Sequence, residues 1–209
     1  MRKEISNDLR GKFGFTASLL YLVTIVFVVY KMIGEMNPAV KSAFFWVIIL
    51  FTAINFVSQS FSTHMKKRKI YLYQLYDPTE LIISRLILNF LKLMIAGLVL
   101  VLIQAAFTNS MVKDPLLFLT GFLLASVGII SILSLVASIS IYSKEQTGLM
   151  TILALPLLIP VLLLAMRISL VSERMFVDSS VSNYLMMLTG IDLLLVTLVI
   201  VFFPIVWKS

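Results

Sequence analysis

The chain has 209 residues, of which 60% are hydrophobic and 13% are charged, and it carries a formal net charge of +7. Its mean hydropathy of +1.05 is far above that of a water-soluble domain, whose surface must be largely polar. The composition therefore excludes an ordinary soluble protein and indicates an integral membrane protein. The absence of cysteine excludes disulfides, CxxC redox chemistry and thiolate metal sites.

The first residues, MRKEISNDLRGKFGF, place Ile5, Leu9 and Phe13 on one face of a helix, with charged residues between them. This pattern predicts an amphipathic helix that lies on the cytoplasmic leaflet before the first span. A disordered basic leader is the alternative. The apolar stretch that follows is too long for the core of a signal peptide, so we expect it to remain as a membrane span.

Apolar stretches of about 20 residues, the length that crosses a bilayer as a helix, recur along the chain. They predict an all-α membrane protein with one domain over residues 1–209 and six spans, at about 15–33, 43–61, 80–106, 116–141, 149–166 and 186–206. Asp77 with Pro78, and Asp114 with Pro115, predict the starts of the third and fourth spans, because aspartate caps a helix and proline suits its first turn. Glu80 adds the second half of a capping box.

The orientation in the membrane follows from the lysines and arginines of the loops. Ten lie on the side of the termini, and these are Arg2, Lys3, Arg10, Lys12, Lys66, Lys67, Arg68, Lys69, Lys144 and Lys208. Five lie on the opposite side, and these are Lys31, Lys41, Lys113, Arg167 and Arg174. Both termini are therefore expected in the cytoplasm.

A polar stripe runs along the third span, where Arg85, Asn89 and Lys92 follow one another at helical spacing. Cations inside a membrane are unfavourable, so the stripe is expected to face protein or water. For Arg85 we favour a side chain that reaches the cytoplasmic headgroups. Lys92 lies deeper, where lining a cavity and pairing with a partner are both possible.

Three other features of the spans are candidates for function. Asp192, near the outer end of the sixth span, either stays hydrated there or pairs with Lys92 or with a neighbouring subunit. Small residues in the fourth span predict close helix packing. Pro156 and Pro160 each remove an amide donor from the fifth span, which is therefore expected to bend.

Nothing in the chain has the pattern of a catalytic or nucleotide-binding site. There is no GxxxxGK[ST] stretch, so a P-loop is excluded. The single histidine, His64, excludes a histidine pair for a metal and is read as a surface residue. Serine nucleophiles lack a nearby base, so a membrane enzyme is the least favoured class.

Between the second and third spans, a cytoplasmic segment at about 64–78 is both basic and rich in tyrosine. Its candidate contact residues are Lys66, Lys67, Arg68, Lys69, Tyr71, Tyr73 and Tyr76. Binding to anionic lipid is the simpler explanation. The aromatic, amphipathic sequence after the charges is more typical of a surface that docks on protein, as a permease without its own nucleotide site needs.

Three stretches carry a resemblance to a known family: LALPLLIPVLLLA at 153–165, YLYQLYDPTELIISRLILN at 71–89 and KEISNDLR at 3–10. They resemble the heme exporter protein B (CcmB) family of cytochrome c maturation over nearly the whole chain. The resemblance implies an ABC-2-type exporter fold, a homodimer in the bacterial inner membrane, and coupling of the 64–78 segment to a cytoplasmic ATPase. The implied partners are CcmA-like, CcmC-like and CcmD-like subunits and a periplasmic haem chaperone, with no nucleic acid.

In that family, ATP hydrolysis drives haem export or the release of the haem-loaded chaperone. We predict no axial haem ligand in this subunit, because His64 faces the cytoplasm and Trp46 and Trp207 are isolated in the sequence. Haem and ATP are then handled by the partner subunits, and this chain binds no cofactor directly. Two alternatives stay open: a permease for another hydrophobic or lipid-linked substrate, and an assembly scaffold that transports nothing.

Overall fold

A computed structural model of the protein describes residues 12–33, 37–75, 77–108, 112–140, 145–175 and 180–208. Within these ranges the regular structure is entirely helical. The helices are α2 (Lys12–Ile33), α3 (Pro38–Leu75), α4 (Pro78–Thr108), α5 (Pro115–Ser140), α6 (Gln146–Ser172) and α7 (Val181–Lys208). The N-terminal amphipathic helix is expected over 1–15, of which residues 1–11 lie outside the described residues and 12–15 are already the first residues of α2.

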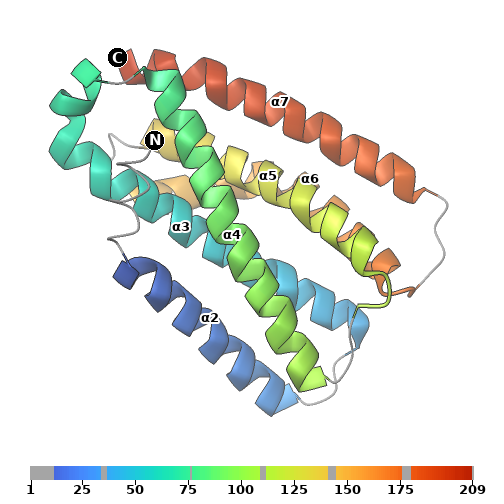
Figure 1. The fold of residues 1–209 in the computed structure, drawn as a ribbon. Helices are drawn as coiled ribbons and strands as arrows, with labels where there is room; N and C mark the ends of the chain where they lie inside the picture. The colour runs from blue at the N-terminus through green and yellow to red at the C-terminus, as the bar shows by residue number, and fades with distance from the viewer. Residues whose placement is uncertain are drawn as a thin grey trace.

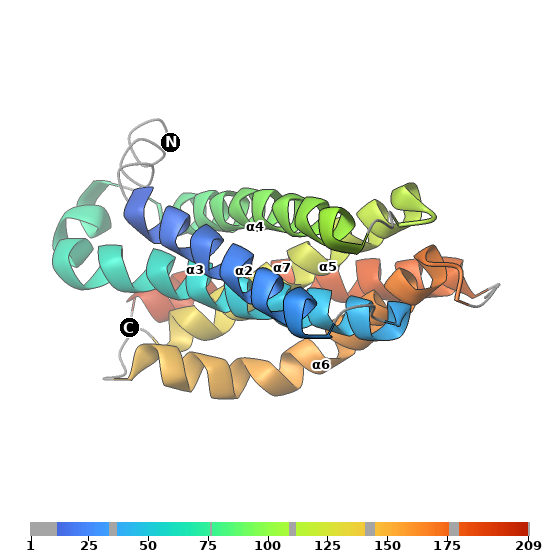
Figure 2. The same ribbon diagram turned by 90° about the horizontal axis from the view of Figure 1, so that it is seen from below.

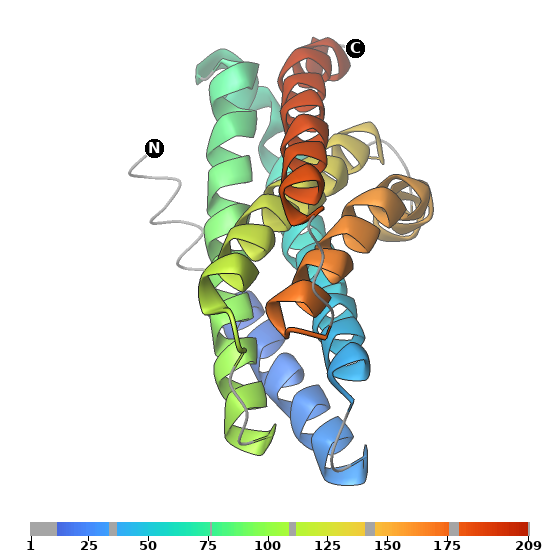
Figure 3. The same cartoon turned by 90° about the vertical axis from the view of Figure 1, so that its right-hand side faces the viewer.

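The helices alternate in direction, so their ends gather at two opposite ends of the bundle (Figures 1 and 3). We call the end where α2 begins and α7 finishes the terminal end. The ends of α3 and α5 and the starts of α4 and α6 also lie there. At the other end, here the opposite end, lie the ends of α2, α4 and α6 and the starts of α3, α5 and α7.

The predicted helix starts at the two prolines are confirmed. Pro78 begins α4, and the Leu81 amide donates to the Asp77 carbonyl at 3.2 Å. Pro115 begins α5, where the Asp114 side chain accepts a hydrogen bond from the amide of Leu117 at 3.2 Å. The Asp114 side chain thus supplies an acceptor to an amide that has no partner inside the helix, whereas the Leu81–Asp77 bond is the first backbone bond of α4.

The apolar stretches that can cross a bilayer are found in five of the described helices: Pro38–Phe61, Pro78–Phe107, Pro115–Ser140, Thr147–Ser172 and Val181–Ile205. The described apolar part of α2, Leu20–Met32, is shorter. The helices also extend beyond several predicted spans. In particular, α6 continues to Ser172 and α7 begins at Val181, which takes up much of the loop expected between them.

At the centre of the bundle lies α5, which packs against α3, α4, α6 and α7. Its buried face consists largely of small residues, namely Gly121, Ala125, Ser126, Gly128, Ser131, Ser134, Ala137 and Ser138. Side chains this small let helix backbones approach closely in a membrane, where no hydrophobic force drives helices together. The predicted close packing of the fourth span is thus observed within one chain.

At the edge of the bundle, α2 packs against α3 and α4. Tyr30 of α2 stacks on Phe107 of α4 with the ring centroids 6.1 Å apart. The lateral surface of the bundle is strongly apolar, and α6 alone exposes Ile152 and Leu163 by 71% and 60%. A surface of this kind is expected to face lipid.

Candidate functional site

The predicted coupling segment is part of α3. The helix carries the apolar stretch Pro38–Phe61 on into the basic segment and ends at Leu75, three residues before Pro78 begins α4. Figure 1 shows α3 curving over its last turns at the terminal end. The side chains of Lys66, Lys67, Arg68, Lys69, Tyr71 and Tyr73 lie outside the described part of the structure, as does the whole of Tyr76.

Arg85 of α4 joins that helix to α3 at the place where the apolar part of α3 ends. Its Nη1 donates a hydrogen bond to the carbonyl of Ser60 at 3.2 Å, and its guanidinium carbon lies 5.0 Å from the ring centroid of Phe61. The residue is only 6% exposed. The sequence favoured an Arg85 side chain that reaches the cytoplasmic headgroups. In the structure the guanidinium instead contacts a carbonyl and an aromatic face of α3, because both are available next to it.

The rest of the polar stripe on α4 is also directed into protein. Asn89 is fully buried, and neither end of its amide has a hydrogen-bond partner among the described residues. Lys92 is half-buried. The stripe thus faces the bundle, as expected from the cost of polar groups in lipid.

Asp192 of α7 is 4% exposed and faces α5. A Cβ built on Gly128 would lie 2.5 Å from its Oδ1 and 3.2 Å from Val161 Cγ1. Neither carboxylate oxygen accepts a hydrogen bond from the described residues, Lys92 included. The sequence allowed Asp192 to stay hydrated near the outer end of its span. The structure instead buries it, because the missing side chain of Gly128 leaves room for the carboxylate inside the bundle.

Hydrogen bonds join α6 to α3 toward each end of α6. Near the terminal end, the hydroxyls of Ser58 and Thr147 lie 2.8 Å apart. Near the opposite end, Trp46 Nε1 donates to Ser169 Oγ at 2.9 Å. Between these contacts, α6 carries Pro156 and Pro160, both exposed, and Figure 2 shows the helix bending along its length. The bend agrees with the expected effect of losing two amide donors.

A cavity of about 330 Å³ lies at the opposite end, between α3, α4, α5 and α6. Its walls are mostly apolar and include a cluster of aromatic rings, in which Phe45 lies 5.2 Å from Phe118 and 5.6 Å from Phe122 between centroids. Five polar side chains also line it, and these are Lys41, Ser42, Gln104, Ser169 and Glu173. We call this cavity the opposite-end pocket.

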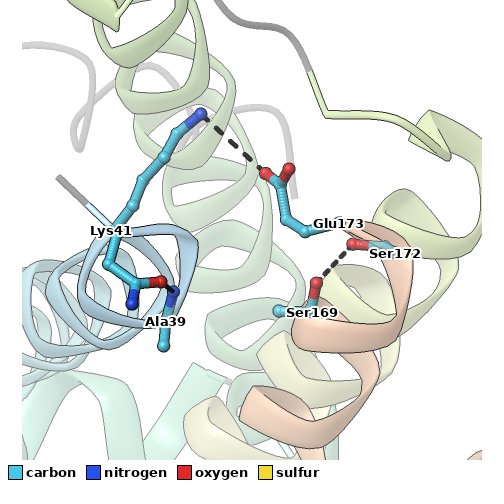
Figure 4. A network of polar contacts seen from close by, with 6 residues as sticks. Ala39, Lys41, Ser169, Ser172 and Glu173 are labelled. Atoms are coloured by element: carbon cyan, nitrogen blue, oxygen red, sulfur yellow. Dashed lines mark hydrogen bonds and ion pairs between the residues drawn. The ribbon is translucent and has the colours of Figure 1, made fainter. Parts of the chain in front are cut away.

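At this pocket, Lys41 Nζ and Glu173 Oε1 lie 3.8 Å apart, with the side chains 11% and 13% exposed (Figure 4). The lysine stands in the first turn of α3, and the glutamate directly follows α6. Ser42 Oγ is buried nearby and has no hydrogen-bond partner among the described residues. The pocket therefore combines an apolar interior with one positive and one negative group.

Sequence reasoning missed this pocket. The sequence indicates Lys41 only as a loop charge that sets the orientation, and no motif in it points to Glu173. A signal was present, because Lys41 precedes one predicted span and Glu173 lies in the loop after another, with opposite charges on the same side of the membrane. Charge alone does not indicate which helices are neighbours. The two charges come together because α3 packs against α6, which only the structure shows.

Among the described residues, no three histidine, aspartate or glutamate side chains converge, so the geometry identifies no metal site there. The long apolar helices, the lipid-facing surface and the buried polar groups define a multi-pass α-helical membrane protein.

The chain belongs to the CcmB protein family, whose model matches residues 1–206. As a member of this family it is a membrane permease component of the haem exporter system for cytochrome c maturation, and part of the Ccm ABC system. No curated protein and no solved structure matches the chain in the corresponding comparisons.

Proposed function

We propose that this chain is the membrane subunit that couples ATP hydrolysis in a separate CcmA-like ATPase to haem export or to the release of a haem-loaded periplasmic chaperone. It acts as a homodimer in the bacterial inner membrane, together with CcmC-like and CcmD-like subunits. ATP and haem are bound by the partners, and this subunit holds no cofactor of its own. The termini are cytoplasmic, and α2 is the first of six spans.

One observation carries the proposal: α3 is a single helix from the opposite end of the bundle to the coupling segment. Although α3 curves over its last turns, its backbone is continuous, so a displacement applied at one end is carried to contacts along its length. An ATPase that binds the last turns of α3 therefore acts directly on the membrane part of the same helix. The basic charge at the terminal end supports an ATPase on that side, since loops rich in lysine and arginine are cytoplasmic.

Movement of α3 is passed to its neighbours by the polar contacts described above. Arg85 connects the base of the coupling segment to α4 through Ser60 and Phe61. The Trp46–Ser169 hydrogen bond connects the other end of α3 to the end of α6. Because two prolines interrupt the hydrogen bonding of α6 between its hydrogen bonds with α3 at Thr147 and at Ser169, α6 is the helix that yields when α3 moves.

The first test is a pulldown of the tagged chain from its native membrane in mild detergent, followed by identification of the co-purifying proteins and an ATPase assay. We expect a CcmA-like ATPase together with other subunits of cytochrome c maturation. If the chain is isolated alone in several detergents, the proposal fails and an assembly scaffold becomes the better explanation.

The second test replaces Tyr73 and Tyr76 by alanine. We expect the ATPase to keep hydrolysing ATP while mature cytochrome c falls several-fold, because the movement no longer reaches the membrane. Tyr21→Ala is the matched control, since Tyr21 is 64% exposed on the lateral surface of α2. Normal levels of cytochrome c in the double variant would count against coupling through this segment.

A further inference from the structure

The opposite-end pocket opens sideways, toward the surface assigned to lipid. Three of its lining residues, Leu98, Leu102 and Leu119, are exposed on that surface by 51%, 67% and 39%. An apolar cavity that is continuous with a lipid-facing surface is accessible to the chains of membrane lipids. Its volume of about 330 Å³ lies within the usual range of ligand pockets.

The polar side of the same pocket selects the headgroup. Lys41 and Glu173 lie 3.8 Å apart and are both largely buried, and together they carry no net charge. An anionic headgroup would be attracted by Lys41 but repelled by Glu173. A headgroup with one negative and one positive group matches both residues, because electrostatic complementarity decides which partner a site accepts.

We propose that the opposite-end pocket binds one molecule of a zwitterionic aminophospholipid. An acyl chain lies between Val101, Leu102 and Phe118, the phosphate is held by Lys41, and the primary ammonium is held by Glu173. The buried hydroxyl of Ser42, which has no protein partner among the described residues, donates to an oxygen of the phosphate or of the ester. A primary ammonium is favoured over choline because it has three N–H donors for the carboxylate and choline has none.

A second groove provides an internal comparison. It lies between α4, α5 and α7, has a similar volume of about 320 Å³, and is lined by apolar side chains with Ser131 as the one hydroxyl among them. None of the described residues that line this groove is charged. It is therefore expected to take up lipid chains without preference for a headgroup, and a variant there serves as a control.

The proposal rests on the membrane class of the protein and is independent of the ATP-driven reaction.

The test reconstitutes the purified chain in nanodiscs of phosphatidylethanolamine and phosphatidylglycerol in equal amounts, and then counts the lipids retained per chain by native mass spectrometry. We expect about one phosphatidylethanolamine, retained about tenfold over phosphatidylglycerol. Ala105→Phe, which fills the pocket, should remove it. Val127→Phe, which fills the second groove, should leave it bound.

Glu173→Gln provides a readout that does not depend on filling the pocket. Without the carboxylate the ammonium loses its partner and the repulsion of an anionic headgroup disappears, so the preference should shift toward phosphatidylglycerol. Lys41→Gln should reduce the retention of both lipids. Equal retention of the two lipids by the unmodified chain, an unchanged preference in Glu173→Gln, or a bound molecule that is not a lipid would overturn the proposal.

Discussion

The carboxylate of Asp192 occupies the space that a side chain at Gly128 would need. A Cβ at that position would lie 2.5 Å from Asp192 Oδ1, which is closer than such contacts allow. The two residues stand on α7 and α5, so their contact sets how closely these helices approach. Position 128 must therefore be glycine if the Asp192 carboxylate is to lie where it does.

The replacement Gly128→Ala should destabilise the protein by about 1–3 kcal/mol, as is typical when a methyl group is forced into a packed interior. The measurement is thermal unfolding in detergent. Gly190→Ala is the matched control, since no atom lies within 4 Å of a Cβ at Gly190. The combination with Asp192→Ala should recover part of the loss. Equal unfolding temperatures for Gly128→Ala and Gly190→Ala would contradict this account.

The replacement Arg85→Met should lower the stability by about 2 kcal/mol, because hydrogen bonds of charged groups and cation–π contacts contribute on that order. Combining it with Phe61→Leu should give less than the sum of the two single effects, since both changes remove the same contact. Arg167→Met, at an exposed position of α6, is the control and should be close to neutral. Strictly additive effects of the two replacements would show that Arg85 and Phe61 do not interact.

The replacement Ser169→Ala should cost about 1–3 kcal/mol, because it leaves the buried indole N–H of Trp46 without its acceptor. Thermal unfolding followed by tryptophan fluorescence reports the change. Thr189→Ala is the control, since Thr189 is exposed and its hydroxyl donates only within its own helix, to the Leu185 carbonyl. An unaltered unfolding temperature for Ser169→Ala would rule out a stabilising role for the hydrogen bond.

The orientation can be measured without background, because the chain contains no cysteine. Single cysteines are introduced at Lys66 and at Lys113 and treated with a membrane-impermeant thiol reagent on spheroplasts. We expect Lys113→Cys to react at once and Lys66→Cys to react only after permeabilisation, as the distribution of basic residues predicts. The reverse pattern would place the coupling segment outside the cell and remove the basis for an ATPase partner.

The sequence was sufficient to locate the apolar helices and the starts of two of them. Hydropathy located the apolar stretches, and Asp77, Pro78, Asp114 and Pro115 marked two helix starts correctly, because these signals are local. It was also sufficient to predict that α5 packs closely, since small residues in a membrane helix have that effect in most settings.

The sequence was not sufficient for the partners of the buried polar groups. The acceptor of Arg85 is 25 residues away along the chain, and Trp46 and Ser169 are 123 residues apart. The burial of Asp192 depends on a glycine in another helix. Which helices are neighbours is decided by the packing of the whole bundle, and a single sequence carries little information about it.

The glycines of α5 also determine how α6 and α7 can move against it. Ile168 of α6 sits over Gly121, where a Cβ would lie 2.5 Å from its Cγ2, just as Asp192 sits over Gly128. Sliding either helix by one turn, about 5.4 Å, would bring its side chain against residues that have a Cβ. Close packing at the two glycines therefore opposes sliding of α6 and α7 along α5. Bending and rotation of these helices are not opposed in this way.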